Sequence, residues 1–495
     1  MAWKYKPISE RTALGSLLAL GLLTRLPYLS WFRAETTDGI MCLEYFLRRW
    51  YDVPRFVIFP GYPLLLNLVD TESWGRLLSS LFAVGTAWPL WRMARRLVPV
   101  ESAFLGCAAF LLSPLSWLWS LRVMPDTMFL FFMWTALERL QAVWETPHDN
   151  RAAVTAFLAS FAALVTRPEG VFLVFATVML LARNRKTAWA ILAAVSPAIL
   201  MFLPGTGSIA RHVFEAFREG GVGVADPVSH FLGSFWVYTT QPTWVLTPIP
   251  VFLAIGGFMR IVAQTDDAAR FWRRLTLPLL GTLLLLKMVP TNYQDRHLLP
   301  FLPAVCALFA VQMESLREYW FRKYGDPGSV MRVNLLAAAA LTYLAVFSLA
   351  CLAVQRDSFG DFRRNAEFLA SVPASTRVFT DEMIKTAHWS GRAVQPWDPA
   401  MQTLRAGDLL VFHTFSTPRL RWLEDTLYDN HRLELVRTDE SSVLPLLTDV
   451  MEDPSLQNRP RAASHRFETQ AFQTRTYRVI RAYVKPRPGR PGGAT

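Results

Sequence analysis

Glu35-Thr36-Thr37-Asp38-Gly39 follows the first long apolar segment of the chain, at residues 14–29, and precedes an amphipathic stretch at residues 40–50. Packing does not require a carboxylate where an apolar segment gives way to polar sequence. A membrane enzyme would need one if its chemistry took place where the first outer loop meets the lipid headgroups. Asp38 is therefore the first candidate catalytic residue, and Glu35 is a second acid in the same motif.

The composition of the chain is that of a membrane protein. Of its 495 residues, 52% are hydrophobic and 18% are charged, and a soluble domain could not bury so much apolar surface. About eleven apolar runs have a length suited to crossing a membrane. These runs are residues 14–29, 77–91, 103–121, 127–143, 153–165, 171–181, 188–203, 244–259, 275–288, 298–313 and 333–354. We expect an all-α polytopic membrane domain over residues 1–354.

The loops between these runs indicate an orientation. Basic residues are concentrated in every second connection, as expected of cytoplasmic loops when the N-terminus lies inside. These residues are Arg92, Arg95, Arg96, Arg139, Arg151, Arg183, Arg185, Lys186, Arg260, Arg270, Arg273, Arg274, Arg317, Arg322, Lys323 and Arg332. Together with attraction to anionic lipids, this bias explains most of the formal charge of +12, so nucleic-acid binding is not required.

The segment at residues 153–181 bears directly on this orientation. Two short apolar stretches flank Thr166-Arg167-Pro168-Glu169-Gly170, and a single bent helix is the alternative to two separate helices. A single helix would move every later basic loop to the outside, so two short spans are favoured. Arg167 and Glu169 then lie near the outer surface.

The C-terminal part of the chain has a different character. An odd number of spans places residues 355–484 outside the membrane, and their frequent charges indicate a small α/β extracytoplasmic domain. Strands are expected at residues 377–380, 408–413 and 477–484, and helices at residues 361–370 and 419–428. The tail at residues 485–495, rich in Pro, Gly and Arg, is expected to be disordered.

Sequence signals of several other protein classes are absent. The chain has no Walker loop, no GxGxxG motif and no Cys/His spacing typical of zinc, which argues against nucleotide-driven transport and most metal hydrolases. Three of the four cysteines lie inside apolar runs, so a disulfide framework is not expected. The lack of an Asn-x-Ser/Thr sequon disfavours passage through a eukaryotic secretory pathway.

Ionisable side chains gather at the outer ends of the apolar runs. They are Glu35, Asp38, Arg122, Asp126, Arg167, Glu169, Lys287, Asp295, Arg296 and His297. Charged groups near a membrane are costly unless they face water or one another, so this pattern predicts a hydrated pocket. Arginine binds phosphate through its planar set of donors, which leaves a carboxylate to act as a base. A substrate whose phosphate is tethered to a lipid tail fits such a pocket.

The order and sidedness of these motifs resemble those of the GT-C glycosyltransferases, especially the bacterial branch similar to protein O-mannosyltransferases and the aminoarabinose transferase. The resemblance extends over nearly the whole membrane part and rests on five stretches. They are Glu35-Thr36-Thr37-Asp38-Gly39, Phe59-Pro60-Gly61-Tyr62-Pro63-Leu64-Leu65-Leu66, Trp74-Gly75-Arg76-Leu77-Leu78-Ser79, Arg122-Val123-Met124-Pro125-Asp126 and Asp295-Arg296-His297-Leu298-Leu299-Pro300. His297 stands where the family has Tyr.

The activity that this resemblance implies agrees with the chemistry of the residues. Such enzymes transfer a sugar from a polyprenyl-phosphate carrier to an acceptor hydroxyl, invert the anomeric centre and use no nucleotide. Asp38 is then the expected general base, and Glu35 and Asp126 are further catalytic candidates. Fixed cations would stabilise the charge on the departing phosphate. The expected phosphate ligands are Arg122, Arg167, Lys287 and Arg296, and the remaining pocket residues are His297 and Glu169.

The resemblance also implies partners and a location. The partners are a polyprenyl-phosphate-linked sugar, a glycan, lipid or protein acceptor, and membrane lipids, and the location is a bacterial inner membrane. The sequence identifies neither the sugar nor the acceptor. Asp38, Glu35 and Asp126 are also suited to bind a divalent cation, so metal dependence is left open.

Other interpretations compete with this one. Asp38 and Asp126 could each cap a helix, and the outer arginines could extend to lipid headgroups. Residues 204–238 suit either an interfacial helix or a mobile gate. A secondary transporter is the first alternative function, although the runs are apolar through their middles and show no repeat. A non-catalytic assembly protein of the cell envelope is the second.

Overall fold

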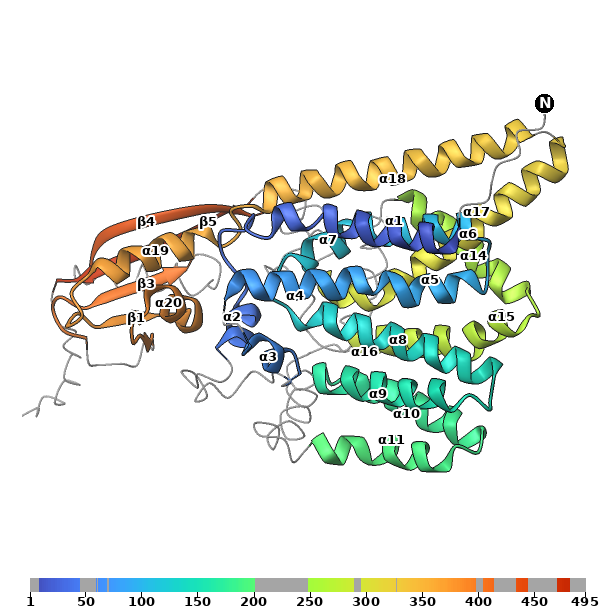
Figure 1. Cartoon of the computed structure of the whole chain (residues 1–495). Helices are drawn as coiled ribbons and strands as arrows, with labels where there is room; N and C mark the ends of the chain where they lie inside the picture. Colours follow the sequence, from blue (N-terminus) through green and yellow to red (C-terminus); the bar gives the residue numbers. More distant parts are fainter. Residues whose placement is uncertain are drawn as a thin grey trace, which may run out of the picture.

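The computed structural model describes residues 9–44, 59, 61–68, 71–200, 248–288, 295–325, 327–397, 404–413, 433–443 and 470–480. Figure 1 shows a bundle of helices that run between two ends, with a small α/β unit attached to one of them. We call the end next to the α/β unit the sheet end and the opposite one the far end.

Each predicted apolar run falls largely on helix wherever the structure describes it. The helical elements of the bundle are α1 (Glu10–Leu23), η1 (Leu26–Tyr28), α2 (Thr37–Leu43), α3 (Gly61–Leu66), α4 (Glu72–Gly85), α5 (Ala87–Arg95), α6 (Val100–Leu112), α7 (Pro114–Ser120), α8 (Pro125–Glu145), α9 (Asn150–Thr166), α10 (Gly170–Arg183), α11 (Thr187–Leu200), α14 (Pro248–Ala263), α15 (Asp267–Phe271), η2 (Trp272–Thr276), α16 (Leu277–Met288), η3 (Asp295–Phe301), α17 (Leu302–Tyr324) and α18 (Pro327–Gln355). The expectation of a mostly helical bundle is therefore confirmed.

The number of membrane spans is a separate matter. Among the described residues, Arg296–Tyr324 and Val330–Ser371 are long and apolar enough to cross a membrane, and the bent pair α6 and α7 makes a third if it counts as one span. Shorter apolar helices lie within α9, α10, α11 and α14. The count of about eleven spans stays a prediction.

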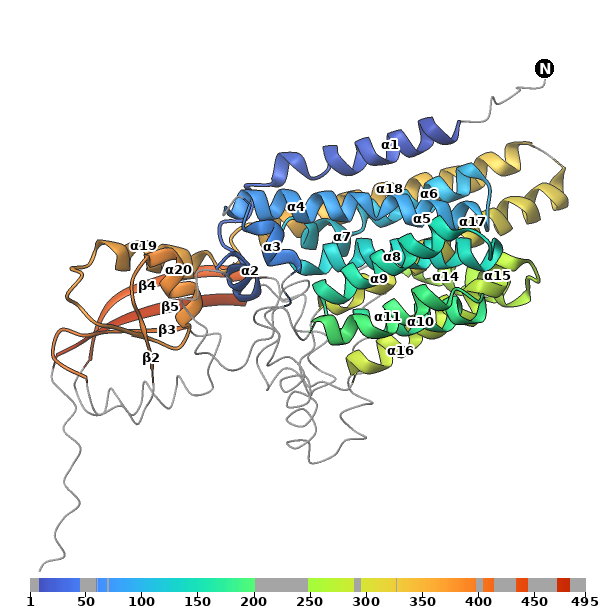
Figure 2. The ribbon, with the colours of Figure 1, turned by 60° about the horizontal axis from the view of Figure 1, so that its bottom comes forward.

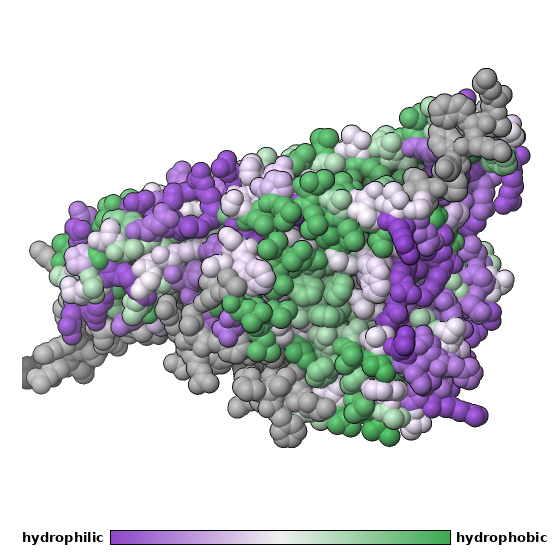
Figure 3. Space-filling model, viewed as in Figure 1, coloured by the Kyte–Doolittle hydropathy of each residue, from purple (hydrophilic) through white to green (hydrophobic). Residues whose placement is uncertain are grey.

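The outer surface of the bundle is apolar. Phe175 is 66% exposed, Met331 62% and Val346 61%. Figure 3 shows a hydrophobic band across the helices, with hydrophilic surface at the far end and over the α/β unit. Such a large exposed apolar surface is unusual for a protein in water and suits contact with lipid chains.

The basic connections lie together at the far end. α5 ends there at Arg95, α8 at Glu145 and α10 at Arg183 (Figure 1). α8 and α10 begin at the sheet end, and Asp126 and Glu169 lie at these helix starts. The connections that alternate along the sequence between rich and poor in basic residues thus lie at the two ends of the bundle.

The third apolar run bends at Pro114. Proline disfavours helical backbone at the preceding residue, and α6 and α7 meet there at 52°. The carbonyl groups freed by the break are bound by side chains from other helices. Arg25 donates from Nη2 to the carbonyl of Leu111 at 3.0 Å. Ser348 donates from Oγ to the carbonyl of Leu112 at 2.7 Å.

α9 and α10 are two separate helices packed against each other, so the two-helix interpretation of this segment is confirmed. Pro168 forces Arg167 into an extended conformation with φ −150° and ψ 146°, which ends α9. A Cβ atom on Gly170 would lie 2.3 Å from the backbone nitrogen of Leu164. Glycine therefore allows α10 to start this close to α9.

The α/β unit contains a five-stranded sheet with the order β2-β1-β3-β5-β4. Its elements are α19 (Gly360–Ser371), β1 (Val378–Thr380), α20 (Met383–Ser390), β2 (Gln395–Pro396), β3 (Leu409–His413), β4 (Leu433–Val443) and β5 (Gln470–Val479). β1 pairs in parallel with β2 and β3, and β5 pairs antiparallel with β3 and β4. α19 packs on β4 and β5, and α20 packs on α19 and on α2 (Figure 2).

The expected helix at residues 361–370 and the strands at residues 377–380 and 408–413 are confirmed as α19, β1 and β3. The expected strand at residues 477–484 is wrong in its limits, because β5 begins at residue 470. Thr474 and Thr476 give the early part of β5 a buried polar face that binds Asp361 and Asn365 of α19, so an apolar pattern does not mark it. β4 and α20 were not expected. Residues 419–428 and 485–495 lie outside the described residues.

Candidate functional site

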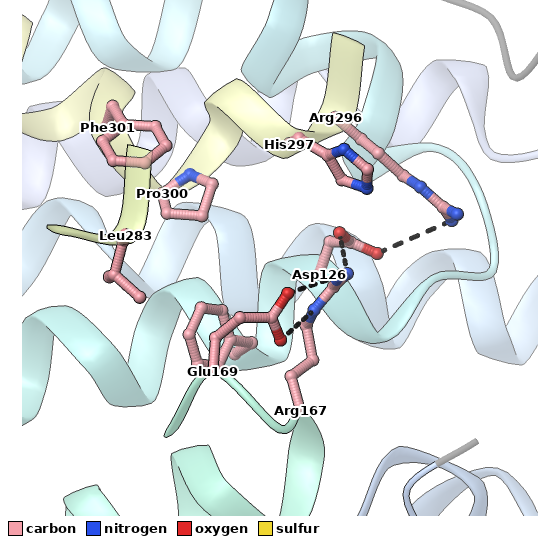
Figure 4. A pocket seen from close by; sticks show the side chains of 9 residues that line it. Asp126, Arg167, Glu169, Leu283, Arg296, His297, Pro300 and Phe301 are labelled. Atoms are coloured by element: carbon pink, nitrogen blue, oxygen red, sulfur yellow. Dashed lines mark hydrogen bonds and ion pairs between the residues drawn. The ribbon is translucent and has the colours of Figure 1, made fainter. Parts of the chain in front are cut away.

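Charged residues from separate parts of the chain line one pocket at the sheet end (Figure 4). Asp126 lies in the first turn of α8, Arg167 and Glu169 lie between α9 and α10, and Arg296 and His297 belong to η3. The apolar part of the wall consists of Phe129, Leu283, Pro300 and Phe301. Five of the residues named from the sequence are therefore neighbours in space.

Arg167 lies between two carboxylates. Its Nη1 donates to Oδ1 of Asp126. Its Nε and Nη2 donate to the two oxygens of Glu169, at 3.1 and 3.0 Å, as a bidentate pair. Because Pro168 takes Arg167 out of α9, the guanidinium reaches across to α8 instead of continuing along its own helix.

Asp126 is a buried acid of which one carboxylate oxygen, Oδ1, accepts a hydrogen bond. Pro125 occupies the first position of α8 and Met124 the capping position, so Asp126 is not the residue that caps this helix. Its Oδ2 has no hydrogen-bond donor among the described residues, and Nη1 of Arg296 lies 3.9 Å from it. The residue is 4% exposed. A buried carboxylate oxygen without a hydrogen-bond donor is costly, and the neighbouring Arg296 offsets part of that cost.

Arg296 is placed by the short helix η3. Trp134 of α8 donates from Nε1 to the carbonyl of Pro300 at 3.1 Å, which fixes η3 against α8. The guanidinium of Arg296 lies 5.9 Å from the ring centroid of Trp119, within the range of a cation–π contact. Arg296 therefore approaches the pocket from the side opposite Arg167 (Figure 4).

The pocket is closed by its own ion pairs. The free space between the lining side chains is about 10 Å³, roughly enough for one water molecule. Two guanidinium groups face two carboxylates, so the opposite charges balance.

The first-loop motif leads into α2. Thr36 caps this helix, since its hydroxyl oxygen accepts the N–H of Gly39 at 3.1 Å. Asp38 is the second residue of α2, so the interpretation of Asp38 as the capping residue is wrong. The side chain of Asp38 lies outside the described part of the structure, as do residues 45–50 of the amphipathic stretch.

Glu35 has both carboxylate oxygens engaged. Oε1 accepts from Nε of Arg76 at 2.5 Å, and Oε2 accepts from the backbone N–H of Val123 at 3.2 Å. The side chain is completely buried. This geometry favours a role for Glu35 in holding the start of α2 in place over direct participation in chemistry.

Met124 connects the first-loop motif to the pocket. The hydroxyl of Thr36 lies 3.4 Å from Sδ of Met124, and Nη1 of Arg296 lies 3.6 Å from the same sulfur. One side chain, that of Met124, therefore separates Thr36, which caps α2, from Arg296 of the pocket.

Arg122 serves a neighbouring part of the loop. Its guanidinium lies 3.7 Å from the ring centroid of Phe32, and its Nη1 donates to the carbonyl of Ala34. It lines a second small cavity together with Trp119 and Gln355. Arg122 thus binds the backbone just before the acidic motif, and it does not line the pocket of Arg167.

The remaining expectations fall partly outside the described structure. The side chain of Lys287 and residues 204–238 are not among the described residues. Within the described part, no group of three His, Cys, Asp or Glu side chains is placed to hold a metal ion.

Sequence reasoning did not single out Arg76, Glu72 or His388, which form a charged network beside α2. Arg76 lies in one of the five stretches that carry the family resemblance, and this position could have marked it as a candidate site residue. Nothing in the sequence around His388 indicates its partners.

The chain forms an apolar helical bundle with an acidic first-loop helix, a charged pocket and an α/β unit at the same end. No family model matches the chain, and no curated protein matches it by sequence. Its structural neighbours include ArnT from Cupriavidus metallidurans bound to undecaprenyl phosphate, with 12% identity and a TM-score of 0.59 over 86% of this chain and 96% of that one.

A second group of neighbours comes from an archaeon. The oligosaccharyltransferase of Archaeoglobus fulgidus in complex with Zn and sulfate has 10% identity and a TM-score of 0.54 over 83% of this chain and 69% of that one. The same protein, AglB, in complex with an inhibitory peptide and a dolichol-phosphate has 12% identity and a TM-score of 0.51, over 78% and 64% of the two chains. At these identities the likeness concerns the fold alone, and it agrees with the helical bundle and small α/β unit expected from the sequence.

Proposed function

We propose that this chain is an integral-membrane glycosyltransferase that takes a sugar from a polyprenyl-phosphate donor and passes it to an acceptor hydroxyl. The observation that carries the proposal is the pocket in which Arg167 and Arg296 flank the half-satisfied carboxylate of Asp126. Among proteins with this fold, ArnT is described as bound to undecaprenyl phosphate and AglB as bound to a dolichol-phosphate. Both ligands are phosphates attached to long isoprenoid tails, which is the substrate chemistry that this pocket suits.

The arginines supply the binding energy for the phosphate. When the donor enters, its phosphate oxygens replace the carboxylate oxygens of Asp126 and Glu169 around the guanidinium of Arg167. Arg296 then faces the phosphate from the other side. Planar guanidinium groups bind phosphate through paired hydrogen bonds, and fixed cations stabilise the negative charge that develops on the leaving group.

Asp38 is the proposed general base. The acceptor oxygen forms a bond to the anomeric carbon as the bond from that carbon to the carrier phosphate breaks. The acceptor proton passes to the carboxylate, and the carrier leaves as a phosphate monoester. Attack from the face opposite the leaving group inverts the anomeric centre. Two observations support this assignment: Thr36 caps α2 in place of Asp38, and Met124 joins this loop to Arg296.

The location and organisation follow from the charge distribution. We place the far end, where the basic connections gather, in the cytoplasm. The pocket and the α/β unit then lie outside the inner membrane of a bacterium. The division into residues 1–354, 355–484 and 485–495, the span count and the participation of Lys287 and Arg122 in phosphate binding belong to the same proposal.

The test uses the purified full-length protein with undecaprenyl-phosphate-linked sugars, with products identified by mass spectrometry. Asp38→Asn should reduce transfer about 100-fold or more, while binding of undecaprenyl phosphate stays within about twofold of wild type. Asp267→Asn, which changes an exposed acid at the far end, is the matched control. Wild-type protein that fails to bind undecaprenyl phosphate would overturn the proposal and favour a transporter or an assembly protein. Unchanged transfer by Asp38→Asn would remove Asp38 from the mechanism.

A further inference from the structure

His388 of the α/β unit forms ion pairs with two acids of the bundle. Its Nδ1 lies 2.6 Å from Oε1 of Glu44, the residue that ends α2, and its Nε2 lies 3.8 Å from Oε1 of Glu72, at the start of α4. The neighbouring Trp389 donates from Nε1 to the same oxygen of Glu72 at 3.1 Å. One turn of α20 therefore contacts the end of α2, whose start belongs to the first-loop motif, and the start of α4.

The network continues from Glu72 to the other end of α2. Oε2 of Glu72 lies 3.2 Å from Nη2 of Arg76, and Arg76 binds the buried Glu35 at 2.5 Å. Arg363 of α19 lies 3.8 Å from Glu72. Opposite charges thus alternate from Glu35, before α2, to Glu44, after it.

Apolar contacts accompany these ion pairs. Ile40 and Met41 of α2 are buried against Ile384 of α20, and Trp389 packs against the same cluster. α2 has only seven residues, and a helix of that length is not stable by itself in water. Its place must come from its neighbours, and α20 and α3 are two of them.

We propose that His388 is a positioning residue: through Glu44 and Glu72 it holds α2, the helix to which Asp38 belongs, in the arrangement that the transfer reaction needs. The importance of α2 rests on the function proposed above, whereas the mechanical coupling can be tested without it. The α/β unit then acts on the reaction through the position of α2, and none of its described residues lines the pocket.

The charge of His388 gives this coupling a pH dependence. Burial alone would lower its pKa, but the hydrogen bonds and charges of Glu44 and Glu72 outweigh that effect and raise the pKa from 6.5 to about 9. Glu72 is also paired with Arg76 of α4 and Arg363 of α19. Below pH 9 the imidazolium joins the two carboxylates, and above it they lose their shared cation.

Cys42 provides a reporter for the position of α2. It lies on α2, is 2% exposed and packs with Tyr62 and Val123. The other cysteines, Cys107, Cys306 and Cys351, lie in helices and can be replaced by alanine to leave one thiol. The rate of maleimide labelling is divided by the rate for the unfolded chain at the same pH, which removes the effect of thiol ionisation.

In the full-length protein at pH 7, His388→Gln should raise the corrected labelling rate of Cys42 about tenfold or more, and His388→Arg should stay near wild type. At pH 10 wild type should approach His388→Gln, whereas His388→Arg should keep Cys42 protected. His148→Gln, the same change at the far end, is the matched control. Hydrogen exchange of the amides of α2 provides the same comparison with all four native cysteines present.

Labelling of His388→Gln within twofold of wild type, or wild-type labelling that does not change between pH 7 and pH 10, overturns the inference. If His388→Gln fails to fold, the pH response of wild type and of His388→Arg still decides the question. Undecaprenyl-phosphate binding is measured on the same samples, with Arg167→Gln alongside. If His388→Gln loses the protection of Cys42 but wild type does not bind undecaprenyl phosphate, the proposed function is refuted and the coupling stands. If wild type binds undecaprenyl phosphate but His388→Gln keeps Cys42 protected, the coupling is refuted and the proposed function stands.

Discussion

Arg76 and Glu35 form an ion pair at 2.5 Å in which the side chains are 4% and 0% exposed. Arg76 also donates to the carbonyl of Leu29 at 3.0 Å, and the second oxygen of Glu35 binds the N–H of Val123. Removing two charges from water is costly, and only complete hydrogen bonding offsets that cost. The pair therefore joins the end of the first apolar segment, the acidic motif and the turn before α8.

We expect Arg76→Gln to destabilise the protein by about 3–5 kcal/mol, because it leaves the carboxylate of Glu35 buried without its cation. Thermal unfolding in detergent, with the Tm of each variant, measures the change. Glu35→Gln should cost a similar amount. The double variant should lose clearly less than the sum, because no uncompensated charge is left. Strict additivity would show that the two side chains do not act as a pair.

Arg167 and Asp126 should affect carrier binding in opposite directions. Arg167→Gln removes a cation from the phosphate position, so the affinity for undecaprenyl phosphate should fall about tenfold to a hundredfold. Asp126→Asn removes the carboxylate that competes for Arg167, so affinity should rise. Titration of the purified protein with the carrier lipid measures both effects. Arg260→Gln is the control, since Arg260 is half-buried and paired with Glu318 at the far end. Weaker binding by Asp126→Asn would argue against competition between carboxylate and phosphate.

Gly170→Ala should destabilise the protein by about 2–3 kcal/mol, because the new Cβ would lie 2.3 Å from the backbone nitrogen of Leu164 and must push α9 and α10 apart. The same movement displaces Arg167, so carrier affinity should fall as well. Gly281→Ala in α16 is a control, since nothing lies within 4 Å of the position its Cβ would occupy. That change should be neutral or stabilise slightly, by about 0.5–1 kcal/mol. Equal Tm values for the two variants would contradict the close approach of α9 and α10.

Local sequence signals explain why much of the fold could be predicted. Pro114 and Pro168 act on the residue directly before them, so a break in an apolar run can be read without knowing its neighbours. The separation of basic from acidic connections likewise follows from the lipid environment alone. The limits of β5 could not be read in this way, because Thr474 and Thr476 are buried as hydrogen-bond partners of α19 and not as apolar residues.

The candidate site was predictable to the extent that it lies at helix ends. Asp126, Arg167 and Arg296 all flank apolar runs on the same side, and the helices bring such positions together. Which charged side chains form ion pairs with one another could not be predicted, because pairing depends on distances between residues that a sequence does not contain. The sequence assigned Glu35 to catalysis, whereas the structure gives it Arg76 as a partner. His388 meets Glu44 across 344 positions of the chain, and no local pattern marks either residue as one of a pair.

The His388 contacts also predict how stability depends on pH. Its pKa is raised from 6.5 in the unfolded chain to about 9 in the folded protein. The stabilisation is therefore complete below pH 6.5 and is lost as the pH rises through 9, by roughly 3 kcal/mol at most. The same contacts, with Arg76 and Arg363, lower the pKa of Glu72 from 4.5 to about 2 despite its burial. That contribution is present above pH 4.5 and is lost as the pH falls through 2.

Unfolding measured between pH 5 and pH 10 should show a drop in Tm across the range 6.5–9 in wild type. His388→Gln should remove most of this drop and start from a lower Tm at pH 6, because the cation is absent at every pH. His388→Arg should keep the higher Tm at pH 9.5, since a guanidinium stays charged there. A wild-type Tm that is constant from pH 6 to pH 9.5, or a drop of the same size in His388→Gln, would mean that another group is responsible for the transition.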